Sequence, residues 1–105
     1  MTDRVGYPYI WEYRVEPAHV DEFVAAYGPE GDWAELFRKH AGYIGTELLR
    51  DRESPDRFVT INSWTDRESW AAFRGEAREA FDALDARCER FTRSERQLGE
   101  FTPVR

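Results

Sequence analysis

The N-terminal third of the chain opens with an alternation of residue types that predicts a β-strand at residues 9–15. One face of this strand carries Tyr9, Trp11, Tyr13 and Val15. A period of two is the spacing of a strand, whose successive side chains point to opposite sides. Residues 43–50 and 57–64 are also rich in β-branched and aromatic residues, and a charged loop joins them as a hairpin. A last strand is expected at about residues 94–102.

Two helices are predicted between the first and second strands. Pro17 suits a first helical turn, and an apolar face with spacings of three and four residues follows it. Gly28 and Pro29 end this helix. Asp32 is the expected N-cap of a second, short helix that carries Trp33, Leu36 and Phe37, and Gly42 ends it.

A longer helical segment follows the third strand. Residues 65–68 read as a capping box, with Thr65 as N-cap and Glu68 at the third position. The apolar stripe behind it consists of Trp70, Phe73, Ala77, Phe81, Leu84, Cys88 and Phe91. Gly75 is a point where this segment breaks or kinks. Cys88 lies on the stripe, which favours a buried structural thiol over a nucleophile.

The order strand, helices, strand, strand, helix, strand predicts an α+β, ferredoxin-like split βαβ fold with a four-stranded antiparallel sheet. Both faces of the third strand are apolar, since Phe58 and Trp64 lie on one side and Val59 and Ile61 on the other. An antiparallel sheet with one solvated face alternates more cleanly. We therefore expect a second subunit to cover the face that the helices leave open, which makes a homodimer.

Composition limits the function classes. The 105 residues suit one domain, residues 1–105 with a core at about 9–102, and their net charge of −6 disfavours binding to nucleic acid or to an anionic membrane. No apolar run is long enough for a membrane span, and the N-terminus lacks the apolar core of a signal peptide. With one cysteine, no intrachain disulfide forms, and we expect a cytoplasmic protein.

Three segments together resemble the antibiotic biosynthesis monooxygenase family of dimeric α/β barrels. They are residues 9–15 (YIWEYRV), 41–50 (AGYIGTELLR), and 58–64 (FVTINSW) with the capped helix start 65–73 (TDRESWAAF). The resemblance covers about residues 9–101. It implies a dimeric barrel and, in some members, oxidation of phenolic polycyclic substrates by O₂ without metal or flavin. It also implies no cofactor for this chain, and a small aromatic molecule as its ligand.

The candidate site is one face of the third strand. Phe58, Thr60, Asn62 and Trp64 alternate onto it, so that flat apolar surface surrounds an amide that can both donate and accept hydrogen bonds. Trp11 and Tyr13 complete the wall if their face of the first strand turns toward the helices. The lid is expected from Trp33 and Phe37 on the short helix and from Trp70 and Phe73 on the long one. Plain core packing is the alternative for these residues.

Asn62, Trp64 and Arg74 are the expected catalytic residues. Arg74 follows the helical stripe, and a guanidinium at the pocket rim stabilises a phenolate or enolate. Its alternative is a surface salt bridge, although the neighbour at i+4 is Arg78, which repels it. His19 and His40 are the only histidines, and no cluster with metal-ligand spacing is visible.

The leading functional hypothesis is a cofactor-independent monooxygenase, an oxidoreductase that acts on an aromatic or polyketide-like molecule. A non-catalytic binding protein and a polyketide cyclase on the same fold are the alternatives. Relatives that degrade heme carry a histidine where this chain has Arg74, and an asparagine on the first strand, where this chain has none. Quinone-forming relatives place a tyrosine where Trp70 stands, and Trp70 cannot relay a proton.

Overall fold

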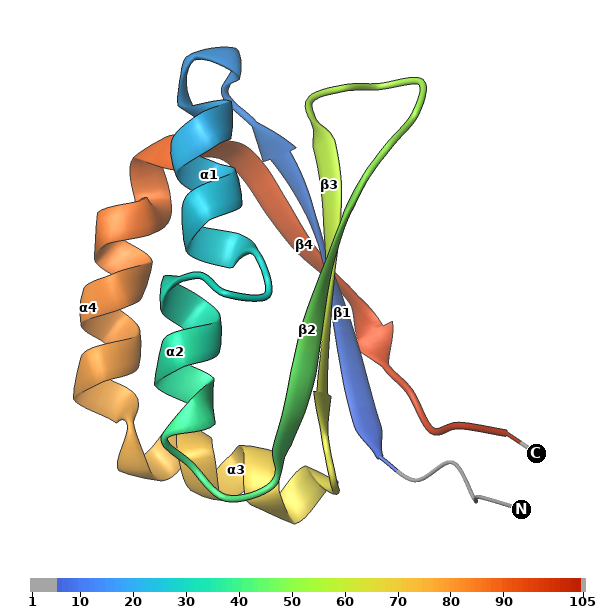
Figure 1. The fold of residues 1–105 in the computed structure, drawn as a ribbon, viewed down its shortest axis with the longest axis vertical. Coiled ribbons are helices and arrows are strands. Elements are labelled where there is room, and N and C mark those ends of the chain that lie inside the picture. Colours follow the sequence, from blue (N-terminus) through green and yellow to red (C-terminus); the bar gives the residue numbers. More distant parts are fainter. Residues whose placement is uncertain (1–5, 105) are drawn as a thin grey trace.

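Four strands form one antiparallel sheet in the order β2-β3-β1-β4 (Figure 1). The computed structural model describes residues 6–104. The strands are β1 (Tyr7–Val15), β2 (Tyr43–Arg50), β3 (Arg57–Trp64) and β4 (Thr92–Glu100). The predicted α+β ferredoxin-like topology is confirmed, and the bounds of the central hairpin agree with the sequence pattern.

The register of the strands determines which side chains share a face. On β1 and β3, Tyr9 lies opposite Asn62, Trp11 opposite Thr60, and Tyr13 opposite Phe58. All six side chains therefore project from the same side of the sheet. The pairing of β1 with β4 is interrupted by register shifts between Ile10 and Trp11 and again between Arg14 and Val15.

All helices of the described chain lie on one side of this sheet (Figure 1). A 3₁₀ turn, η1 (Pro17–His19), leads into α1 (Val20–Tyr27), and α2 (Asp32–Arg38) follows. After the hairpin come α3 (Arg67–Glu76), α4 (Arg78–Cys88) and the 3₁₀ turn η2 (Glu89–Phe91). The long apolar stripe is thus divided between two helices, and the break falls at Ala77, two residues after Gly75.

Two predicted helix caps were wrong by one residue. The N-cap of α2 is Gly31, and Asp32 is the first helical residue. A Cβ at position 31 would collide with the backbone oxygens of Ala25 and Ala26, so this close turn requires glycine. The N-cap of α3 is Asp66, whose carboxylate accepts a 2.8 Å hydrogen bond from the Ser69 amide. Thr65 continues the hairpin instead, because its amide donates to the Gly42 carbonyl over 2.7 Å.

Aromatic rings fill the space between the helices and the sheet. Phe23 of α1 stacks on Tyr27 with a centroid distance of 4.3 Å and meets Tyr13 edge-on at 5.2 Å. Further along, Phe73 packs against Trp64 at 5.2 Å. These contacts make an aromatic core, and the rings that border its remaining space become candidates for ligand contact.

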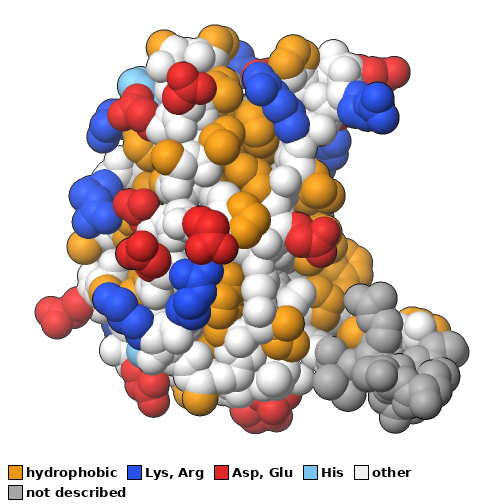
Figure 2. Space-filling view, viewed as in Figure 1, with side chains coloured by type: hydrophobic (Ala, Val, Ile, Leu, Met, Phe, Trp, Pro, Cys, Tyr) orange, Lys and Arg blue, Asp and Glu red, His pale blue; other side chains and the backbone are white. Residues whose placement is uncertain are grey.

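The opposite face of the sheet carries apolar and charged residues side by side. Ile10, Val59 and Ile61 are half-buried there, and Leu49 is exposed. At the hairpin end, Arg57 donates to Glu12 over 2.5 Å and to Asp51 over 3.0 Å. Figure 2 shows apolar side chains along the right-hand flank, which is this face seen from its edge. No helix within residues 6–104 is long and apolar enough to cross a membrane.

Candidate ligand-binding site

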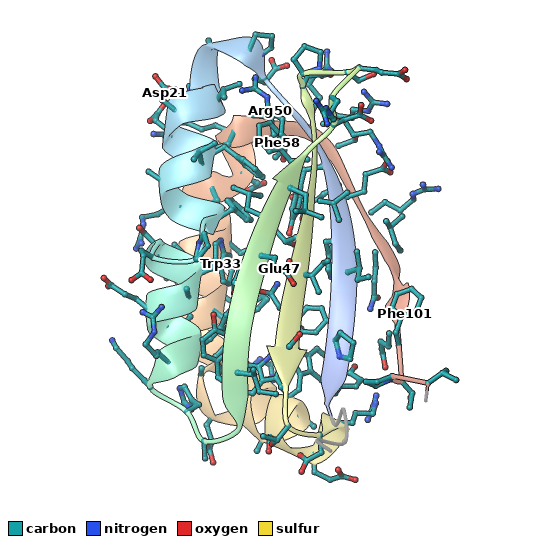
Figure 3. The ribbon with its side chains drawn as sticks, turned by 45° about the vertical axis from the view of Figure 1, so that its right-hand side comes forward. Asp21, Trp33, Glu47, Arg50, Phe58 and Phe101 are labelled. Atoms are coloured by element: carbon teal, nitrogen blue, oxygen red, sulfur yellow. The ribbon has the colours of Figure 1, made fainter. Side chains whose placement is uncertain are left out.

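A cavity of about 310 Å³ lies between the sheet and the helices. Its volume is at the lower end of the range of small-molecule sites. Rings from five elements line it, namely Tyr9, Trp11 and Tyr13 of β1, Tyr27 of α1, Trp33 and Phe37 of α2, Trp70 of α3 and Phe81 of α4. Figure 3 shows Trp33 in the space between α2 and the sheet. Such a lining suits a flat aromatic ligand.

The structure brings eight of the sequence-predicted site residues to this cavity. They are Trp11, Tyr13, Trp33, Phe37, Thr60, Asn62, Trp70 and Arg74. The face of β1 that carries Trp11 and Tyr13 does turn toward the helices. Thr60 and Tyr13 are joined across the strands, since their hydroxyl oxygens lie 3.2 Å apart.

Three sequence-predicted site residues do not line the cavity. Trp64 and Phe73 are 0% exposed and Phe58 is 2% exposed, each within the aromatic core. Phe58 lies toward the hairpin, where the Arg50 guanidinium carbon is 5.0 Å from its ring centre (Figure 3). The alternation on β3 correctly put these side chains on the helix side, but alternation does not say how far along a strand a cavity extends.

Sequence reasoning missed the polar side of the cavity. Asp85 of α4 and Glu95, Gln97 and Glu100 of β4 line it, together with the rings of Tyr9, Tyr27 and Phe81. Gln97 lies opposite Trp11 and Glu95 opposite Tyr13. The alternation of Glu95 and Gln97 on the last strand was the available signal, but its register against β1 depends on a bulge that the sequence does not reveal.

Asn62 is held by side chains of the neighbouring strand β2. Its Oδ1 accepts a 2.6 Å hydrogen bond from Thr46 Oγ1, which in turn lies 2.6 Å from the Tyr43 hydroxyl. Asn62 is 7% exposed. A buried amide held on one side is a fixed polar point within the aromatic lining, and such points orient a ligand.

Arg74 lies at the cavity on two aromatic rings. Its guanidinium carbon is 4.1 Å from the ring centre of Phe81 and 5.7 Å from that of Trp70. Within residues 6–104 it forms no ion pair, and Glu76 on the same helix pairs with His40 instead, at 3.2 Å. A guanidinium held by aromatic faces keeps its donors available to an anionic group.

Burial changes the acid–base properties of the cavity. It raises the pKa of Tyr9 to about 12 and raises the pKa of Tyr13 as well, so both phenols stay neutral donors. Burial, with the charge of Asp85 second, also raises the pKa of the Glu95 carboxyl. A carboxylate with a raised pKa is a better proton acceptor.

Residues 6–104 hold no cluster of three metal-ligating side chains of the histidine, cysteine or carboxylate type. Cys88 is buried outside the aromatic cavity, and burial raises the pKa of its thiol. A thiol with a raised pKa is a poor nucleophile. The residues that line the cavity offer ring stacking, hydrogen-bond donation by Asn62, Arg74 and the indole N–H groups of Trp33 and Trp70, and proton exchange with carboxylates.

Comparison with solved structures finds the same fold in several bacterial proteins. SnoaB, a cofactor-independent oxygenase from Streptomyces nogalater, is 20% identical, with 97% of this chain and 96% of that chain covered and a TM-score of 0.74. A candidate antibiotic biosynthesis monooxygenase from Nitrosomonas europaea is 15% identical, with 99% and 95% covered and a TM-score of 0.74. A nipsnap family protein of unknown function from Agrobacterium tumefaciens is 13% identical, with 99% and 93% covered and a TM-score of 0.70.

No curated protein matches the chain significantly. The profile of one family, described as antibiotic biosynthesis monooxygenase, matches residues 9–87. This match extends from β1 through most of α4 and includes the sequence segments that carry the resemblance. The chain belongs to the antibiotic biosynthesis monooxygenase family.

Proposed function

We propose that this protein is a cofactor-independent monooxygenase that oxidises an aromatic or polyketide-like molecule with O₂. The observation that carries the proposal is the aromatic cavity with Asn62 and Arg74 in its lining. The fold it shares with SnoaB, a cofactor-independent oxygenase, supports the proposal.

In such a reaction the substrate itself supplies the electrons. Removal of a proton from an anthrone gives an enolate, whose negative charge is shared between carbon and oxygen. Arg74 and the Asn62 amide would stabilise the oxygen, and the aromatic walls would exclude water. Glu95 is a suitable acceptor for the proton, because its pKa is raised and it lines the same cavity.

The overall reaction balances without another reductant. Anthrone and O₂ give anthraquinone and water: one oxygen atom enters the ring carbon as a carbonyl, and the other leaves as water with the two hydrogens of that carbon. The four electrons that reduce O₂ come from the substrate. No step requires an electron from the protein.

The test is O₂ uptake by the purified protein with anthrone and a panel of hydroquinones, with the product identified by mass. Incorporation of ¹⁸O from ¹⁸O₂ into the quinone above the rate of the protein-free reaction supports the monooxygenase. Binding of these probes without O₂ uptake would favour a binding protein. Ring closure of a linear polyketide without O₂ uptake would favour a cyclase.

We also propose that the functional unit is a homodimer that buries the face of the sheet opposite the helices. Ile10, Val59 and Ile61 are half-buried on that face, and no helix within residues 6–104 covers them (Figure 1). The adjacent charges of Glu12 and Arg57 already neutralise each other. A second copy would remove the apolar residues from water without leaving either of these charges unpaired in the interface.

A further inference from the structure

Three side chains form a hydrogen-bonded series that runs from β2 to the cavity. Thr46 Oγ1 donates to Asn62 Oδ1 over 2.6 Å, and the Tyr43 hydroxyl oxygen lies 2.6 Å from Thr46 Oγ1. A threonine hydroxyl has a single proton, and this one is given to Asn62. The Tyr43 hydroxyl must therefore be the donor to Thr46.

The direction of donation agrees with the acidity of the groups. A phenolic hydroxyl is a stronger donor than an aliphatic one, and an amide oxygen is a good acceptor with two lone pairs. Successive bonds in one direction polarise one another and strengthen the series. The arrangement therefore fixes the Asn62 amide, with its oxygen turned toward β2.

The other half of that amide has no partner among residues 6–104. Asn62 is 7% exposed and lines the aromatic cavity, and its nitrogen occupies the branch of the amide turned away from Thr46. An N–H₂ group that a ligand closes off from water needs an acceptor, and a ligand oxygen would supply it. Arg74, in the same lining, is also a donor without an acceptor side chain among the described residues.

We propose that Tyr43 and Thr46 are positioning residues that turn the N–H₂ group of Asn62, and not its carbonyl, toward the ligand. The ligand must then present an acceptor oxygen at that point, such as a ring carbonyl or an enolate oxygen. The aromatic character of the ligand rests on the proposed function, whereas the orientation of the amide does not.

Two probes with the same tricyclic skeleton test the acceptor requirement. Anthrone has a ring carbonyl and 9,10-dihydroanthracene lacks it. Binding is measured without O₂, from the quenching of tryptophan fluorescence, since Trp11, Trp33 and Trp70 line the cavity. The parent protein should bind anthrone more tightly, and Thr46→Val should reduce that preference roughly 3- to 10-fold, the range of one neutral hydrogen bond.

Conservative variants separate positioning from packing. Thr46→Ser keeps the hydroxyl and should keep the preference, whereas Tyr43→Phe should reduce it less than Thr46→Val does. Thr102→Val, at an exposed position outside the cavity, should leave the preference for anthrone unchanged. A Thr46→Val protein with the full parental preference would overturn the proposal, as would equal binding of the two probes by the parent.

A measurement without ligand decides the orientation directly. In ¹⁵N-edited NOE spectra, the side-chain amide protons of Asn62 should give cross-peaks to ring protons that border the cavity. Strong cross-peaks to Thr46 would show the reversed series and overturn the proposal. If anthrone preference and these cross-peaks are found but O₂ uptake is absent, the oxygenase proposal fails and this one stands.

Discussion

The guanidinium of Arg74 lies over the ring of Phe81, seven residues along the chain and on the next helix, with 4.1 Å between the guanidinium carbon and the ring centre. The two residues belong to separate helices, α3 and α4, so the contact joins them across the break at Ala77. Both residues line the cavity. The contact holds a cation beside aromatic surface, where an anionic ligand group would meet it.

Removing this cation should weaken ligand interactions more than it weakens the fold. Arg74→Ala should reduce anthrone affinity or raise the oxidation barrier by about 1–3 kcal/mol, as should Asn62→Ala. Arg74 is exposed at the surface, so thermal melts of its variant should stay near the parent. Arg78→Ala, at an exposed position at the start of α4, is the control. Parental binding and turnover in both cavity variants would place the ligand elsewhere.

Phe73 should behave in the opposite way. It is 0% exposed and packs against Trp64, Phe37 and Phe81. Phe73→Ala should lower the free energy of unfolding by about 3–5 kcal/mol, measured by urea titration, because it removes a buried ring. Phe73→Leu should be milder and should keep the cavity able to bind anthrone. A Phe73→Ala protein of parental stability that has lost anthrone binding would instead make Phe73 a ligand contact.

The sequence predicts some features of the site and not others. The alternation on β1 and β3 was sufficient to put Trp11 with Tyr13 on one face, and Thr60 with Asn62 on another, because the period of a strand is local information. That the β1 face turns toward the helices, opposite Thr60 and Asn62, was left open and follows from the strand pairing. The difference between Phe58 in the core and Thr60 at the cavity depends on which helix residues cover each position. That is a tertiary property, and neither spacing nor composition contains it.

The polar lining was missed for a related reason. Glu95 and Gln97 belong to a strand whose residues are nearly all exposed in this chain, so its pattern has little apolar signal. Their positions opposite Tyr13 and Trp11 follow from the register shift beside Ile10. A bulge changes which residues share a face, and it is difficult to infer from one sequence. The predicted cap of α3 was wrong by one residue because the Thr65 amide pairs with Gly42 in the hairpin. That of α2 was wrong because the close turn before the helix requires glycine at position 31.

Two glutamates should affect stability with opposite signs of pH dependence. The hydrogen bond from Arg57 lowers the pKa of Glu12 below its usual 4.5. The stability that the ionised Glu12 carboxylate contributes is therefore fully present above pH 4.5, and it is lost as the pH falls through the lowered pKa. Glu12→Gln should destabilise the protein at pH 7 and have little effect in strong acid. Glu47→Gln is the control (Glu47 is labelled in Figure 3), because Glu47 of β2 lies opposite Ile61 and so shares this face of the sheet.

Glu95 should show the reverse. Burial and the nearby charge of Asp85 raise its pKa, with Glu89 adding to the effect. A carboxyl whose pKa is raised in the folded protein contributes stability below pH 4.5. This contribution is lost as the pH rises through the pKa of the folded state. Because the Glu95 side chain is partly open to solvent, Glu95→Gln should stabilise the protein only slightly at pH 7, and the gain should vanish in acid. Urea titrations at several pH values measure both variants, and a Glu95→Gln protein less stable than the parent at pH 7 would contradict the expected sign.

The uncovered face of the sheet gives a prediction about assembly. Light scattering at micromolar concentration should give about twice the chain mass of 12.4 kDa. Ile61→Glu places a charge in the middle of that face and should give a folded monomer. Val24→Glu, at an exposed apolar position on α1, should leave the mass measured by light scattering at that of the dimer. A monomeric parent protein would refute the homodimer.

The bulged strand β4 has a consequence for solubility at high concentration. It lies at an edge of the sheet, where unpaired N–H and C=O groups can recruit strands from other molecules. Its two register shifts bend that edge, and Gly99 has a φ of 155° that a straight strand would not adopt. Arg93, Glu95 and Arg96 add charge along it. Edge-to-edge addition of strands from other molecules at β4 is therefore disfavoured.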